Sequence, residues 1–160
     1  MTETRVVDEQ FGELLQEFVN RVSHLQGNTL SVLTDESVTL QQVLLLRRMQ
    51  QLGQSTPSDL ADMMRMSAPA VSQMIDRLFA LELLTRSEAP DDRRRKMLAV
   101  TQKGSALLTR IRKARAAEYA AGTARLSPKV RTELARVLRK ALEELPEEAQ
   151  ALAPERSPVV

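Results

Sequence analysis

The feature of this sequence that most constrains its fold is a change of hydrophobic period within residues 56–100. The first part holds two helical runs, which open at Thr56 and Ser67 with a proline one or two positions later, as capped helices do. The second part holds two short extended runs around a polar loop, which is typical of a hairpin. The segment therefore predicts two short helices followed by strands at Leu84–Glu88 and Lys96–Val100.

A third helix is predicted directly before this segment, over residues 40–52. Thr39 and Gln42 form a capping-box pattern at its start, and Gly53 follows its end. Residues 43–46 are apolar on nearly every side of this helix, so we expect it to be buried in the middle of the fold.

The chain also carries an apolar helical stripe at each end. The helix that carries the first stripe ends at Gly27-Asn28 or extends through Leu30, Val32 and Leu33. A helix capped by Thr101 follows the hairpin and runs to about Ala121, and the last helix starts at Ser127-Pro128 and stops at Pro146. The residues of the two stripes are Val7, Phe11, Leu14, Phe18, Val22 and Leu25, then Val130, Leu134, Leu138, Ala141 or Leu142, and Leu145.

This order of elements predicts a mostly α fold with a small β-hairpin wing, a winged helix-turn-helix flanked by further helices. The formal net charge of +2 hides an asymmetry, because residues 65–113 hold 11 basic and 5 acidic side chains while residues 1–64 hold 4 and 9. A basic centre favours a polyanionic partner, although a general abundance of arginine would give a similar balance.

In such a fold the helix that begins after Ser67 enters the DNA major groove by its N-terminal end. Glutamine pairs bidentately with adenine, serine reaches a base or a phosphate, and alanine or proline contacts a thymine methyl. A short basic loop between the strands can place an arginine in a narrow minor groove. The candidate contacts are Ser67, Ala68, Pro69, Ala70, Ser72, Gln73 and Arg77 on the helix, and Arg93, Arg94 and Arg95 in the loop.

The segment from Thr56 to Gly104 resembles the DNA-binding core of the MarR transcriptional regulators. The match includes SxxxVSxxIDRL at residues 67–78, DxR at residues 92–94 and TxKG at residues 101–104. The combination is specific although each piece alone is weak, and the flanking helices extend the family plan over residues 8–145. The matching segment reads TPSDLADMMRMSAPAVSQMIDRLFALELLTRSEAPDDRRRKMLAVTQKG.

The resemblance implies a homodimer in which the first and last helices of each subunit interlock, and which binds a pseudo-palindromic operator. It implies dimerisation helices at residues 8–33 and 104–146 and a DNA-binding domain at residues 39–103. Residues 147–160 are expected to form a flexible tail. The alternative is that the two apolar stripes pack on each other within one chain.

The resemblance also assigns roles to single residues. Arg94 becomes the wing arginine of the minor groove, held by Asp92, whose alternative role is loop solubility. Arg77 contacts phosphate or pairs with Asp76. Gln73 stands where the family often has arginine, so a preference for adenine in place of guanine is expected.

The family implies a small aromatic or anionic effector, bound in a cleft between the dimer helices and the winged domain. His24 and Arg47 are the candidate ligand residues. The alternative for His24, which lies on the first helix, is an ordinary surface or interface histidine. Met63, Met64, Met66 and Met74 fill a core, or sense oxidation.

The composition argues against the other function classes. No cysteine and a single histidine leave no basis for thiol chemistry, multi-histidine metal sites or histidine triads. Five single glycines form no phosphate-binding loop, so neither an enzyme nor a cofactor is expected. With no apolar run of membrane-spanning length, the expected location is the cytoplasm. The expected function is a DNA-binding transcriptional regulator that acts as a repressor. The alternatives are a winged-helix dimer for protein–protein assembly and a DNA-binding regulator without an effector.

Overall fold

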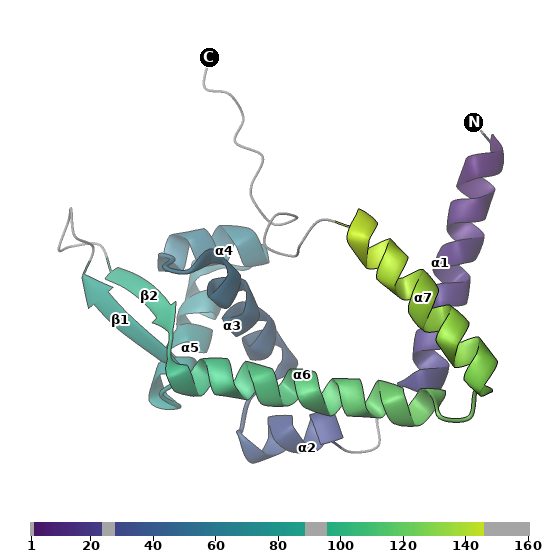
Figure 1. Ribbon diagram of the computed structural model, residues 1–160. Helices are drawn as coiled ribbons and strands as arrows, with labels where there is room; N and C mark the ends of the chain where they lie inside the picture. Colours follow the sequence, from purple (N-terminus) through teal and green to yellow (C-terminus); the bar gives the residue numbers. More distant parts are fainter. Residues whose placement is uncertain (1, 24–27, 89–95, 146–160) are drawn as a thin grey trace. The chain divides into compact units, whose positions relative to one another are not determined.

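The computed structural model describes residues 2–23, 28–88 and 96–145, which form helices and one two-stranded sheet (Figure 1). Mostly helical structure with a small hairpin is the predicted fold class, and it is confirmed. The elements in chain order are α1 (Thr2–Val22), α2 (Asn28–Asp35), α3 (Leu40–Leu52), α4 (Pro57–Met64), α5 (Ala68–Ala80), β1 (Leu84–Glu88), β2 (Lys96–Val100), α6 (Gln102–Thr123) and α7 (Pro128–Glu144).

The chain divides into two compact units. The boundaries fall between Glu36 and Ser37, within α6 after Thr109, and within α7 after Val137. The winged unit holds α3, α4, α5, both strands, the start of α6 and the last part of α7. The helical unit holds α1, α2, the rest of α6 and the first part of α7.

Local capping explains where the helices of the winged unit begin. Thr39 and Thr56 each accept a hydrogen bond from the backbone N–H three residues later, and Gln42 and Asp59 complete the two capping boxes. Gly53, at φ 75°, ends α3 in a conformation that residues with a Cβ rarely adopt. The predicted bounds of α3 are confirmed.

The hairpin is antiparallel, with Leu84 opposite Val100 and Glu88 opposite Lys96. Both predicted strands are confirmed. Ser55 extends the pairing, because its N–H donates to the Leu98 carbonyl at 3.1 Å and its carbonyl accepts from the Leu98 N–H at 2.8 Å. The core of the winged unit lies among α3, α4, α5 and this hairpin. Its fully buried side chains are Leu45, Leu46, Met49, Leu60, Val71, Ile75, Leu78, Leu83 and Leu98.

Two predicted core positions of the winged unit are wrong. In the sequence, Phe79 follows Val71, Met74, Ile75 and Leu78 at helical spacing and is predicted on the same inner stripe, but it is 45% exposed, because the buried face of α5 is formed by those four residues and the Phe79 ring lies beside the Arg86 guanidinium outside the core. Leu44 was expected to be buried with its neighbours but is 43% exposed, because the buried face of α3 is formed by Val43, Leu45 and Leu46.

In the helical unit, α1 and α2 are separate helices that both contact α6. Val22 at the end of α1 is buried, and Gly122 of α6 approaches its backbone so closely that a Cβ on Gly122 would lie 2.7 Å from the Val22 Cα. One turn earlier on α6, Glu118 accepts a hydrogen bond from the Thr29 N–H at 2.8 Å. The end of α1 and the start of α2 therefore both contact α6.

The last helix, α7, begins after Ser127, whose hydroxyl accepts from the Val130 N–H at 3.3 Å. None of its residues is buried within one copy of the chain. Its predicted stop at Pro146 and the tail that follows lie outside the described residues. Among the described helices, none is both long and apolar enough to cross a membrane.

Candidate nucleic-acid interface

The two helices of the candidate interface are joined by a tight turn. Arg65 ends α4 in the left-handed region at φ 51°, and its N–H donates to the Ala61 and Asp62 carbonyls. The Ser67 hydroxyl then caps α5 by accepting from the Ala70 N–H at 3.4 Å. Since Pro69 lies in the first turn, its missing N–H costs no hydrogen bond.

Burial divides α5 into two faces. Val71, Met74, Ile75 and Leu78 are buried against the rest of the winged unit. The opposite face, which as a candidate DNA-contact face is expected to be exposed, is exposed except at Ala70, which is half-buried. The exposed candidates on this face are Ser67, Ala68, Pro69, Ser72, Gln73 and Arg77.

One carboxylate lies among these polar side chains. Asp76 accepts a hydrogen bond from Nη2 of Arg86 on β1 at 2.7 Å. The Arg86 guanidinium also lies 5.0 Å from the centre of the Phe79 ring. Asp76 therefore pairs with Arg86 and not with Arg77. Within the described residues Arg77 has no carboxylate partner.

The base of the hairpin is tied to α6 by the TxKG motif. The Thr101 hydroxyl donates to the Glu82 carbonyl at 2.8 Å, and the Thr101 N–H donates to the Leu83 carbonyl at 3.1 Å. Lys103 pairs with the Glu82 carboxylate at 3.1 Å. Gly104 allows the start of α6 to lie close to the Leu83 backbone, because a Cβ at position 104 would be 2.5 Å from the Leu83 carbonyl oxygen. The motif therefore fixes the turn between α5 and β1.

The loop candidates Asp92, Arg93, Arg94 and Arg95, and the ligand candidate His24, lie outside the described residues. Arg47, the other ligand candidate, is exposed on α3. Its neighbour Arg48 is half-buried, and its buried Nη1 atom has no hydrogen-bond partner in the described part of the chain. Of the two neighbouring arginines, Arg48 is therefore the partly buried one.

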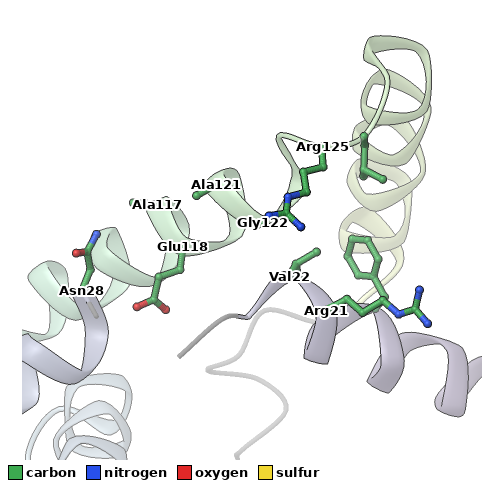
Figure 2. A pocket seen from close by; sticks show the side chains of 10 residues that line it. Arg21, Val22, Asn28, Ala117, Glu118, Ala121, Gly122 and Arg125 are labelled. Atoms are coloured by element: carbon green, nitrogen blue, oxygen red, sulfur yellow. The ribbon is translucent and has the colours of Figure 1, made fainter. Parts of the chain in front are cut away.

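The helical unit contains a cavity of about 600 Å³ (Figure 2). Figure 2 shows Glu118 and Arg125 extending from α6 and the turn after it, on the side where Val22 and Asn28 lie. Arg21 pairs with Glu17 at 2.6 Å, whereas Glu118 is held by the Thr29 N–H. The lining residues are Phe18, Arg21, Val22, Asn28, Ala117, Glu118, Ala121, Gly122, Arg125 and Leu126.

Neither ligand candidate from the sequence is among the residues that line this cavity. The sequence signal that could have found it is Gly122, a single glycine inside an alanine-rich helix, because such a glycine often marks a close backbone approach. Arg21 and Arg125 carry no comparable signal.

A helix-turn-helix with an exposed second helix, followed by a hairpin wing, defines a DNA-binding winged-helix protein. Residues 38–96 match the MarR family. The chain is 34% identical over 109 residues to YhbI, an uncharacterised HTH-type transcriptional regulator of Bacillus subtilis, with 68% of each chain covered. The chain belongs to the MarR family of transcriptional regulators.

Two solved structures show the same fold. The transcriptional regulator Tm0710 from Thermotoga maritima superposes with a TM-score of 0.74 at 24% identity, over 85% of this chain and 94% of that one. The Staphylococcus aureus MepR–DNA complex superposes with a TM-score of 0.58 at 20% identity, over 86% of this chain and 96% of that one.

Proposed function

We propose that this regulator is a homodimeric repressor that binds a pseudo-palindromic operator near its own gene in the cytoplasm and is released by a small effector. The observation that carries the proposal is the division of α5 into a buried face and an exposed face with Ser72, Gln73 and Arg77. The similar fold of MepR, which was solved as a DNA complex, supports the same role for the winged unit.

The exposed face of α5 offers chemistry suited to base reading. The Gln73 amide can donate to and accept from one adenine edge in the major groove, and Ser72 can reach a neighbouring base or phosphate. Arg77 has no carboxylate partner within the described residues, so its charge is available to a phosphate. Arg94, supported by Asp92, is proposed for the minor groove, with Arg93 and Arg95 adding positive charge.

Homodimerisation is supported by the apolar surface that a single copy leaves exposed. Large apolar side chains in contiguous exposed patches mark interfaces in soluble proteins. On α7 the apolar stripe has no buried member, although the sequence places it at regular helical spacing. The exposed apolar residues of α1 and α7 are Phe11, Leu14, Leu15, Val130, Val137, Leu138 and Leu142, and exposed Leu145 directly follows α7.

The cavity of the helical unit is the proposed effector site. Its wall is apolar at Phe18, Val22 and Leu126, while Arg21 and Arg125 supply positive charge. An aromatic or otherwise apolar molecule with one anionic group fits that combination. A ligand bound there would change DNA affinity by favouring one arrangement of the dimer helices over another.

The alternative function is a winged-helix dimer that binds proteins instead of DNA. The arginine-rich wing loop argues against it, because unpaired charges are costly to bury against a protein surface. The remaining alternative is a DNA-binding regulator without an effector, and it differs only in the response to ligand.

A binding titration separates these functions. The full chain is titrated by gel shift against DNA from directly upstream of its own gene and against a scrambled duplex, at two salt concentrations. We expect tight binding to the upstream DNA alone, with an affinity that falls steeply as salt rises, because phosphate contacts release counterions. Equal affinity for both duplexes, or no binding at either salt, would contradict operator recognition.

The matched control variant is Arg112→Gln, which removes an exposed arginine of α6 from the helical unit. We expect it to bind as the unmodified chain does, whereas Arg77→Gln and Arg94→Ala weaken binding. Small aromatic acids are then added to the preformed complex. Release of DNA by one of them, lost on Arg125→Gln, would support the effector site; release that Arg125→Gln leaves unchanged would place the effector elsewhere.

A further inference from the structure

Arg86 links the candidate recognition helix to the hairpin. Its guanidinium pairs with Asp76 at 2.7 Å and lies over the Phe79 ring at 5.0 Å, so it contacts two residues one turn apart on α5. Both partners are exposed, and Arg86 itself keeps 43% of its side-chain surface accessible. The cluster therefore lies at the surface, outside the buried core.

The sheet register explains how Arg86 reaches α5. Its Cα is paired with that of Leu98 across the hairpin. Paired residues share a face of a sheet, and Leu98 is 1% exposed, so this is the face that packs against the rest of the winged unit. The Arg86 side chain therefore leaves β1 toward α5, while Thr85 and Ser87 leave from the other face.

The negative charge of Asp76 is unfavourable on a surface that is proposed to bind DNA. Ser72 and Gln73 lie four and three positions before it, so the three side chains are neighbours on the helix surface. A carboxylate on a surface that approaches phosphates is repelled by them. The guanidinium of Arg86 removes that charge at short range, and its planar face also covers the exposed ring of Phe79.

We propose that Arg86 is a positioning residue for DNA recognition. It neutralises Asp76 on the DNA-facing side of α5 and fixes the angle of β1, and so of the hairpin, against this helix. An exposed ion pair of this kind adds little to folding stability, so its effect is expected in DNA binding. This inference rests on the proposed DNA interface.

The test uses Arg86→Gln and the double variant Asp76→Asn/Arg86→Gln, titrated against the upstream DNA over a series of salt concentrations. Arg86→Gln leaves the carboxylate uncompensated, and we expect about threefold to tenfold weaker binding with a shallower salt dependence, as for the loss of one positive charge. The double variant restores the net charge, and we expect its salt dependence to return to that of the unmodified chain and most of the affinity to recover. Arg86→Lys keeps the charge but not the planar stack, and an intermediate affinity with unchanged salt dependence is expected.

Two outcomes would overturn the inference. Binding by Arg86→Gln equal to that of the unmodified chain would show that the cluster has no role in recognition. A double variant as weak as Arg86→Gln would show that Arg86 contacts DNA directly. Arg112→Gln serves as the control for removal of any exposed arginine, and thermal unfolding confirms that each variant is folded. If the unmodified chain does not distinguish upstream from scrambled DNA, the proposed function fails; if it does and Arg86→Gln matches it, only this inference fails.

Discussion

The backbone N–H of Thr29 donates a hydrogen bond to Oε1 of Glu118, 2.8 Å away and 89 positions later in the chain. Thr29 lies in the first turn of α2, which has no acidic residue there. The carboxylate of α6 therefore acts as the N-cap of α2. This single contact ties the start of a short helix to α6.

Removing this cap should loosen α2. Glu118→Ala is expected to lower the free energy of unfolding by about 0.5–2 kcal/mol, the range found for lost N-caps. Glu118→Gln keeps an acceptor oxygen and should lose less. Urea unfolding measures the loss, and hydrogen exchange at the Thr29 amide locates it. Unchanged protection of that amide in Glu118→Ala would contradict the capping role.

Gly122 is required by the close approach of α6 to the end of α1. In Gly122→Ala the new Cβ would lie 2.7 Å from the Val22 Cα and still closer to the Val22 carbonyl oxygen, and both are backbone atoms. We expect a loss of about 1–3 kcal/mol in unfolding free energy, as for overpacking.

Gly12 provides the matched control, because it lies within α1 and a Cβ at this position would meet nothing within 4 Å. Gly12→Ala should raise helix stability by up to about 1 kcal/mol. Both variants are compared by urea unfolding, and equal effects of the two substitutions would refute the packing argument.

Glu82 occupies the left-handed region at φ 61°, which residues with a Cβ adopt at a cost. Glu82→Gly should relieve roughly 1 kcal/mol of this cost. The Lys103 pair that it removes is exposed and adds little. Glu82→Ala removes the pair but keeps the backbone strain, so it should be slightly less stable than the unmodified chain. Thermal unfolding ranks the three, and the order fails if glycine is the least stable.

Tyr119 is the single tyrosine of a chain without tryptophan, so its ionisation can be followed directly by absorbance. A hydrogen bond from Arg115 Nε at 3.0 Å lowers the pKa of the hydroxyl below its ordinary value of 10.0, against the opposing effect of burial. We expect a titration midpoint below 10.0. Arg115→Gln should move the midpoint upward.

The same shift has a consequence for stability. Because the folded state has the lower pKa, the contribution of Tyr119 is present above the unfolded pKa and is lost as the pH falls through the folded pKa. A midpoint that Arg115→Gln leaves unchanged would show that this hydrogen bond does not hold the phenolate.

Gln73 should determine base preference at one position of each half-site. Gln73→Ala is expected to reduce discrimination at that position by about 1–3 kcal/mol if the contact is bidentate, while affinity for scrambled DNA changes little. Competition with single-base operator variants measures the effect. Gln50→Ala, an exposed glutamine of α3, is the control. An equal loss on all sequences would rule out base reading by Gln73.

Elements that depend on local chemistry could be predicted from the sequence. The caps at Thr39, Thr56 and Ser67 and the glycine at position 53 act over three or four residues, and the structure confirms each. The two strands could also be predicted, because the polar loop between them and the change of hydrophobic period are features of a short stretch of sequence. The exposed face of α5 followed from its helical spacing, with Ala70 as the exception.

Features that depend on distant partners could not be predicted. The apolar stripe of the first helix continues through position 25, whereas α1 ends at Val22 and α2 is capped by Glu118 from α6. Phe79 continues the apolar spacing of its helix, so the sequence predicts a core residue. Its contact with the Arg86 guanidinium arises only when the hairpin folds beside α5. The cavity of the helical unit combines α1, α2 and α6, so its lining could not be predicted from spacing within one helix, although the single glycine at position 122 marks the close approach of α6 to α1.

The central claim is that two copies of α5 read one operator. The most direct measurement is selection of bound duplexes from a randomised pool by the unmodified chain, followed by sequencing. The account predicts an enriched inverted repeat whose half-site centres lie about 10 base pairs apart, one helical turn, with adenine favoured at one position of each half. Enrichment of a single unrepeated site, or no enrichment over the starting pool, would contradict it.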